Sequence, residues 1–270
     1  AVYLLHGPLV SGIIESVADG EVYGNTEGDT LGEEVAVVGD INGDGTTDVA
    51  ATWQYPLSVL FVSSTHTGAT AVTSALGVDA IRATDTAWNG TSYRGIEGVG
   101  DWDGDGQDDY AVMTNFGVRL YLGPVGSGTV NVASDLTFSI TFETYLAQRT
   151  AHGDFAHDGY PDMVMGDYNG AHAYILRGNS SGAWVSPTGP CPDRIAVNNG
   201  GGGEHMDVAN LGDTDGDGTD DIGVTASLVG TSWIMSGNIS GVASTSTDAM
   251  ATVNGGGNLE GGWALSGVDM

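Results

Sequence analysis

An aspartate- and glycine-rich segment that occurs four times in register constrains this chain more than any other feature. The first aspartates of the four copies are Asp40, Asp101, Asp154 and Asp213, so the copies are 61, 53 and 59 residues apart. A short apolar run and then a glycine follow each copy. Repetition at such a period indicates one supersecondary unit used several times, with neighbouring units stacked to bury their apolar faces.

The segments between the copies are short, β-branched or alternating, and bounded by Gly, Asn, Asp and Ser, which is typical of strands and turns. Within one unit we expect strands at 35–39, 49–53, 58–63 and 70–75. The chain is therefore predicted to be all-β. Serial units of four antiparallel strands favour a β-propeller with one four-stranded blade per repeat.

The two ends of the chain fit the same frame. Residues 2–8 match the apolar run that follows each aspartate segment, and residues 267–270 match the start of an aspartate segment. We expect one propeller domain or fragment over 1–270, with about five blade units present. The expected units are 1–30 (partial), 31–90, 91–145, 146–205, 206–260 and 261–270 (partial). A fragment of a larger ring is preferred over five blades that close a smaller one.

The repeated segment has the spacing D-x-[D/N]-x-D-G-x-x-D, which supplies oxygen ligands for calcium. Side chains at positions 1, 3 and 5, a glycine at position 6 and a backbone carbonyl at position 7 make a calcium loop, and position 9 adds a carboxylate. Calcium takes six to eight oxygens, whereas magnesium prefers strict octahedral geometry and keeps its waters. An EF-hand is excluded because position 12 is never Glu and the flanks are β-like.

Three copies carry full sets of predicted ligands, in which the residue at position 7 contributes its carbonyl. Loop 1 (40–48) offers Asp40, Asn42, Asp44, Thr46 and Asp48. Loop 2 (101–109) offers Asp101, Asp103, Asp105, Gln107 and Asp109. Loop 4 (213–221) offers Asp213, Asp215, Asp217, Thr219 and Asp221. Loop 3 (154–162) has Ala156 at position 3 and keeps Asp154, Asp158, Tyr160 and Asp162, so we expect three full calcium sites and one weaker, water-completed or empty site.

The charge balance limits the partners. The chain has 6 basic residues, all Arg, against 35 acidic ones, and its formal net charge is −29. Nucleic acid is excluded as a partner because phosphates are bound by Lys and Arg patches. No apolar run reaches 18 residues, so direct membrane insertion is not expected. Calcium is scarce in the cytosol, so calcium loops of ordinary affinity favour a secreted or cell-surface protein.

The four loops, with Tyr-Leu-x-x-Gly-Pro at 3–8, the related Tyr-Leu-Gly-Pro at 121–124 and Leu31-Gly32, resemble the FG-GAP/VCBS repeat family of integrin-α-type propellers. The resemblance implies a ring that usually has seven blades, with calcium loops on one face and ligand contacts on the opposite face. Aromatic and basic residues expected on that opposite face are candidate ligand contacts, with inter-blade packing as the alternative. These candidates are Trp53, Tyr55, Trp88, Tyr93, Arg94, Phe116 and Tyr168.

No catalytic constellation stands out in the sequence: the six histidines are scattered, and no nucleophile elbow or zincin motif occurs. The preferred interpretation is a non-catalytic extracellular module for adhesion, for binding a protein or glycan, or for a surface or filament assembly of its own copies. The alternative is the propeller domain of a secreted enzyme that degrades polysaccharide or lipid.

Overall fold

The computed structural model describes residues 1–8, 11–24, 30–54, 57–71, 80–85, 93–114, 117–138, 146–167, 172–178, 193–197, 206–226 and 230–254. In these ranges the chain is built from strands, with one short helix, α1 (Ile14–Val17). The all-β expectation is thus confirmed. No helix in the described residues is both long and apolar enough to cross a bilayer.

The described strands form five separate sheets, which we name A to E in chain order. Sheet A contains β1 (Val2–Leu4), β2 (Gly20–Tyr23) and β6 (Gly68–Ala71). Sheet B contains β3 (Val35–Gly39), β4 (Asp48–Gln54), β5 (Leu57–Ser63), β7 (Ala80–Thr84) and β11 (Thr129–Asn131). Sheet C contains β8 (Tyr93–Gly100), β9 (Asp109–Thr114), β10 (Gly117–Tyr121) and β12 (Leu136–Phe138).

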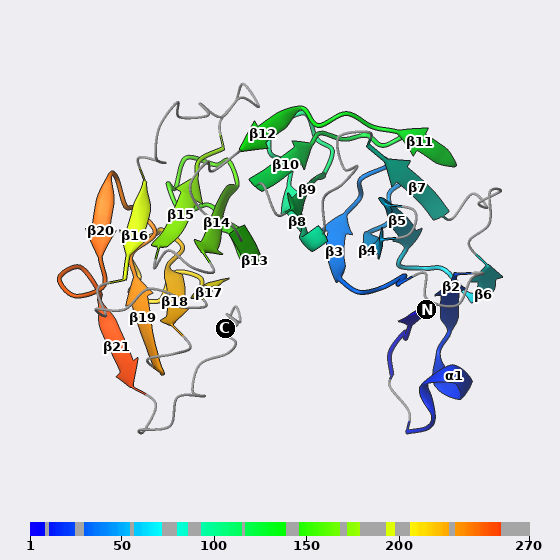
Figure 1. Ribbon diagram of the computed structural model, residues 1–270, viewed down its shortest axis with the longest axis horizontal. Helices are drawn as coiled ribbons and strands as arrows, with labels where there is room; N and C mark the ends of the chain where they lie inside the picture. The colour runs from blue at the N-terminus through cyan, green and yellow to red at the C-terminus, as the bar shows by residue number, and fades with distance from the viewer. Residues whose placement is uncertain are drawn as a thin grey trace.

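The two remaining sheets complete the described part of the chain. Sheet D contains β13 (Leu146–Gly153), β14 (Asp162–Asp167), β15 (His172–Leu176), β16 (Arg194–Ala196) and β20 (Val242–Ser244). Sheet E contains β17 (Met206–Asn210), β18 (Ile222–Ala226), β19 (Thr231–Met235) and β21 (Ala251–Asn254). Figure 1 shows the sheets following one another in an open arc.

Among the described strands, three sheets take an edge strand from the unit that follows them in the chain. β6 pairs in parallel with β2, β11 with β7, and β20 with β16, while the other described pairs are antiparallel. In each case the chain leaves the third strand of its own sheet, adds one strand to the preceding sheet, and returns. The predicted fourth strand at 70–75 is therefore corrected: β6 belongs to sheet A, and the fourth strand of the unit is β7.

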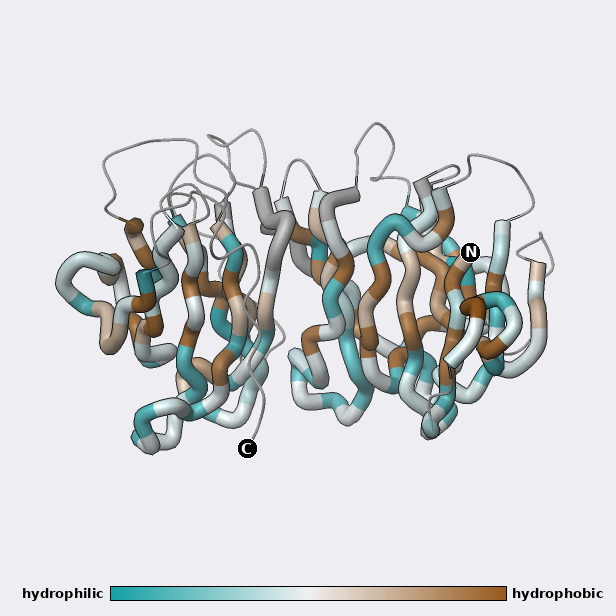
Figure 2. Tube along the Cα trace, turned by 90° about the horizontal axis from the view of Figure 1, so that it is seen from below, coloured by the Kyte–Doolittle hydropathy of each residue, from teal (hydrophilic) through white to brown (hydrophobic). Residues whose placement is uncertain are grey.

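The hydrophobic core lies between successive sheets, which pack face to face. In β9 every residue is buried, because the two faces of this strand contribute to different cores. Tyr110 and Val112 pack in the cluster shared with sheet B, and Ala111 and Met113 pack in the cluster shared with sheet D. A strand buried on both faces reads as a continuous apolar run. Figure 2 shows hydrophobic residues along the strands and hydrophilic ones at the turns along the lower edge.

The predicted propeller of four-stranded antiparallel blades, and its extension to seven blades, is wrong. The described strands form five separate sheets of three to five strands, and none of these sheets is closed or curled. No strand pair of the described residues joins sheet A to sheet E. The layers instead stack in series, as in a β-sandwich, with one core between each pair of neighbours. The repeat predicted the first three strands of a unit but neither the fourth strand nor the way in which the units stack.

Candidate metal centres

Each aspartate loop connects the first two strands of one sheet, and the loops lie next to one another. Loop 1 joins β3 to β4, loop 2 joins β8 to β9, loop 3 joins β13 to β14, and loop 4 joins β17 to β18. The carboxylate of Asp108, at position 8 of loop 2, accepts the backbone N–H of Asp40 in loop 1 at 2.7 Å. Asp220 of loop 4 accepts the Nδ2–H of Asn210 at 2.9 Å, and Asn210 also donates to the carbonyl of His152 beside loop 3.

The four loops share one hydrogen-bonded frame, which loop 2 illustrates. Asp101 at position 1 accepts the N–H groups of Asp105 and Gly106 at 2.9 Å. Asp105 at position 5 accepts the N–H of Gln107 at 2.8 Å. Loops 1, 3 and 4 make the same two kinds of contact from positions 1 and 5. Each carboxylate is thereby oriented while lone pairs remain for a cation.

The position-9 carboxylates are buried beneath the loops: Asp48 is 1% exposed, and Asp109, Asp162 and Asp221 are fully buried. Burial raises the pKa of Asp48 to about 7, and the charges of Asp44 and Asp40 add to this effect. Burial likewise raises the pKa of Asp109 to about 7, although hydrogen bonds from Gly123 and Trp102 oppose it. A buried carboxylate without a cation is costly, so these positions favour either a proton or a metal ion.

In two loops the predicted ligands come together closely enough to hold one ion. Oxygens of Asp101, Asp103 and Asp109 all lie within 4.8 Å of one another, and so do those of Asp213, Asp215 and Asp221. A calcium ion bound 2.3–2.6 Å from each oxygen fits such a cluster. Asp105 and Asp217 belong to the same loops but not to these clusters. Loops 2 and 4 could therefore each hold a metal ion.

Two buried oxygens point to a missing partner. Oδ2 of Asp48 and Oδ1 of Asp221 have no hydrogen-bond donor among the described residues. Buried polar atoms in native structures are nearly always paired, so a buried carboxylate oxygen without a donor indicates a place for an ion or a water molecule. In loop 1 the amide of Asn42 takes the place of one carboxylate, and its Oδ1 accepts the N–H of Asp44 at 2.8 Å.

Loop 3 differs from the other loops at position 3, where its sequence departs from the repeated pattern. Ala156 at position 3 offers no side-chain oxygen, and its N–H donates to Oδ2 of Asp162 at 2.9 Å. Asp154, Asp158 and Asp162, all of which the structure describes, do not form a cluster of the kind seen in loops 2 and 4, and neither do the carboxylates of loop 1. Oδ2 of Asp162 instead lies 2.7 Å from Nη1 of Arg177, a residue that the sequence analysis did not select.

The contact that Asp108 makes between loops 2 and 1 was likewise not predicted from the sequence. Gly39, directly before loop 1, has φ +79, and a Cβ at this position would overlap the Asp108 carboxylate. Glycine is thus required here both for the left-handed backbone and for the close approach of the next loop. The repeated glycine before position 1 was the available signal for this contact.

Of the seven candidate ligand contacts, Trp53 is the one whose side chain the structure describes. Trp53 is 4% exposed, packs in the core between sheets A and B, and lies under the Arg82 guanidinium, which is 4.8 Å from its ring centroid. Its role as a ligand contact gains no support from this position. Tyr55, Trp88, Phe116 and Tyr168 lie outside the described residues, and of Tyr93 and Arg94 only the backbone, in β8, is described.

Comparisons with known proteins leave the family open. No family model matches the chain, so the FG-GAP/VCBS resemblance stays a prediction. No curated protein matches it either. Among solved structures, the V. cholerae biofilm matrix protein Bap1 is similar, with a TM-score of 0.40 and 16% identity over 84% of this chain. The chain spans 29% of the length of that protein.

Proposed function

We propose that this chain is a non-catalytic, extracellular calcium-binding module. Loops 1, 2 and 4 each hold one calcium ion, and the loaded module serves adhesion, binds a protein or glycan, or assembles with its own copies. The observation that carries the proposal is the set of buried position-9 carboxylates, of which Asp48 and Asp221 each keep one oxygen without a donor. A hard dication satisfies these oxygens and the neighbouring carboxylates together.

The arrangement supports calcium in a structural role. Each loop ties two strands of its sheet, and its carboxylates would repel one another without a cation. An ion that binds the folded loop and not the unfolded chain stabilises the fold by mass action. The extracellular placement rests on the same ion, since calcium is abundant outside the cell.

The non-catalytic assignment rests on the chemistry available near the loops. An open depression of about 350 Å³ lies beside loop 1, lined by Asn42, Asp44, Ile81, Pro124, Val125, Gly126 and Ser127. Among the described residues that line it, Asp44 is the ionisable one, and the proposal assigns it to calcium. Acid–base or nucleophilic catalysis needs a second positioned group within hydrogen-bond reach, and this lining does not supply one.

Calcium titration of the metal-free chain by isothermal calorimetry, with metal analysis of the dialysed product, tests the proposal. We expect three calcium ions per chain, and two after Asp103→Ala or Asp215→Ala, because each change removes the side-chain oxygen at position 3, as Ala156 does in loop 3. Glu33→Gln, a matched change of an exposed acidic residue, should leave the count at three. Absence of stoichiometric calcium at millimolar concentration would contradict the proposal.

A further inference from the structure

We infer that in loop 3 the guanidinium of Arg177 takes the place of the metal ion, so that this loop is closed by a cation of the chain itself. The inference rests on the proposed function, since it explains why loop 3, alone among the four equivalent loops, is not assigned a calcium ion. Loop 3 is then a permanent clamp between sheets D and E that is independent of calcium.

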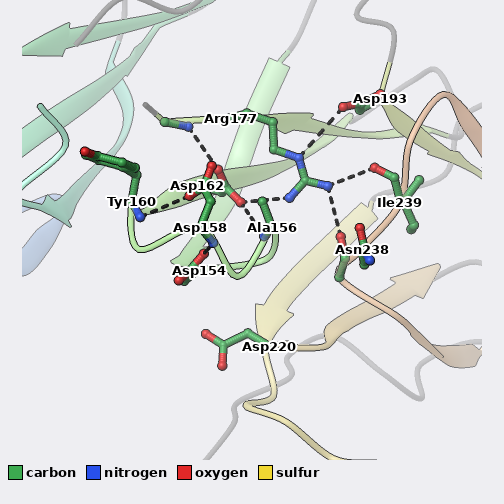
Figure 3. A network of polar contacts seen from close by, with 12 residues as sticks. Asp154, Ala156, Asp158, Tyr160, Asp162, Arg177, Asp193, Asp220, Asn238 and Ile239 are labelled. Atoms are coloured by element: carbon green, nitrogen blue, oxygen red, sulfur yellow. Dashed lines mark hydrogen bonds and ion pairs between the residues drawn. The ribbon is translucent and has the colours of Figure 1, made fainter. Parts of the chain in front are cut away.

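Arg177 reaches three parts of the molecule at once, as Figure 3 shows. Its Nη1 donates to Oδ2 of Asp162 at 2.7 Å, and its Nη2 donates to the carbonyls of Gly237 and Ile239 at 3.0 and 2.8 Å. Its Nε lies 3.8 Å from Oδ2 of Asp193. Gly237 and Ile239 follow β19 of sheet E, whereas Asp162 begins β14 of sheet D, so one side chain connects two sheets.

The contacts leave little room for calcium at Asp162. Its Oδ2 accepts both Arg177 Nη1–H and the Ala156 N–H, and its Oδ1 accepts the Gly178 N–H at 2.9 Å. A carboxylate oxygen has about two acceptor sites, so Oδ2 is saturated. In loop 4, by contrast, Oδ1 of the equivalent Asp221 has no donor. A fixed positive charge beside Asp162 also repels a dication.

The unit of loop 3 departs from the other units at two positions, Ala156 and Arg177, and the two changes complement each other. In the units of loops 2, 3 and 4 the apolar run after the loop ends at a glycine. The residue before this glycine is Leu122 in the unit of loop 2, Arg177 in that of loop 3 and Ser236 in that of loop 4. The one unit whose loop lacks a ligand at position 3 is the one that carries a cation here. Only 6 basic residues occur in a chain of net charge −29, so a basic residue at this position is not a common surface feature.

Calcium stoichiometry of the full chain tests the exchange of cations. The wild-type chain is expected to bind three ions, and Ala156→Asp alone still three. The double variant Ala156→Asp with Arg177→Ser, which copies Asp215 and Ser236 of the unit of loop 4, is expected to bind four ions. A fourth stoichiometric ion in the wild-type chain or in Ala156→Asp alone would overturn the inference, because Arg177 would then not exclude calcium.

Hydrogen exchange in EDTA supplies a readout that needs no calcium binding. We expect chelation to speed exchange at least tenfold in 101–109 and 213–221 and to leave 154–162 unchanged. In EDTA, Arg177→Met should speed exchange in 154–162 at least tenfold, whereas Arg119→Met, which removes an arginine of sheet C, should not. Unchanged exchange in Arg177→Met would overturn the inference. Chelation that alters none of the loops would instead contradict the proposed function and leave the Arg177 result to stand alone.

Discussion

Loops 3 and 4 connect equivalent strands of the neighbouring sheets D and E, and each covers a fully buried aspartate at position 9. Asp162 is met by three donors, including a guanidinium, whereas Asp221 keeps an oxygen without a partner next to two further carboxylates. The comparison teaches that the repeat retains a buried negative charge and changes the cation that satisfies it. In loop 3 a cation of the chain meets that charge, and in loop 4 the proposed calcium ion would do so.

Removal of calcium should give the largest difference. A ligand at a hundredfold excess over its Kd contributes about 2.7 kcal/mol per site, so three sites contribute about 8 kcal/mol. At this chain length about 1 kcal/mol corresponds to roughly 2–4 °C, and we expect Tm to fall on the order of 15–30 °C in EDTA. Differential scanning calorimetry with and without calcium measures this. An unchanged Tm after verified metal removal would contradict the structural role proposed for calcium in loops 1, 2 and 4.

Replacement of the two buried aspartates should separate the loops. Asp162→Asn removes the carboxylate nearest the Arg177 guanidinium and leaves only Asp193, 3.8 Å from Nε, and breaking a buried ion pair costs about 3–5 kcal/mol. Because the Arg177 side chain is 23% exposed, we expect the lower end, about 3 kcal/mol, with or without calcium. Asp221→Asn should destabilise the protein in calcium but not in EDTA, where it removes an uncompensated charge. Urea unfolding with calcium and with EDTA measures the two losses of stability. If calcium changes the stability of the two variants equally, loops 3 and 4 do not differ in the cation that they use.

Transfer of the loop 3 features to loop 4 should make the two loops alike. Asp215→Ala should abolish one calcium site and lose about 2.7 kcal/mol of calcium-dependent stability. Adding Ser236→Arg places a guanidinium at the position equivalent to Arg177, and part of that stability should return in EDTA. Urea unfolding in EDTA compares the single and double variants, with Ser236→Met as the control for side-chain bulk. If Ser236→Met restores as much as Ser236→Arg, the charge is not what stabilises the loop.

The smallest expected effect is on pH dependence. The pKa of Asp48 and of Asp109 is about 7 in the metal-free fold, above the ordinary value of 3.8. Each group therefore contributes stability to the metal-free protein that is present below about pH 4 and lost as pH rises to about 7. Calcium holds both carboxylates ionised, so its stabilising effect should grow over the same window, with affinity at loops 1 and 2 falling about tenfold per unit below pH 7. Calorimetric titrations at pH 5, 6, 7 and 8 check the slope, and a flat profile would contradict it.

The loops were predictable from sequence because their chemistry is local. Nine consecutive residues carry the ligands and the turn glycines, and the positions predicted for loops 2 and 4 include both carboxylate clusters. Fourfold repetition also fixed the strands on either side, since β3, β4 and β5 lie within a residue or two of their predicted bounds.

The stacking of sheets and the Arg177 contact depend on residues far apart in the chain, and the sequence pattern carried little of either. Nothing local in residues 68–71 distinguishes a strand of its own sheet from one that joins the preceding sheet. Arg177 contacts carbonyls 60 and 62 residues away, at Gly237 and Ile239. The available signal was the joint departure of Ala156 and Arg177 from the other units, which a search for ligands alone passes over.

The parallel edge strands have a consequence for folding. Sheets A, B and D each gain an edge strand, β6, β11 or β20, only when the following unit has reached its place. The unit that supplies β20 also supplies β19 to sheet E, so unfolding of sheet E exposes the edge of sheet D. Neighbouring units should therefore fold and unfold together, in the manner of coupled repeats whose stability lies in the interfaces as much as in each unit. Truncation after residue 230 would then unfold sheet D as well as sheet E, and the chain would lose order in steps larger than one repeat.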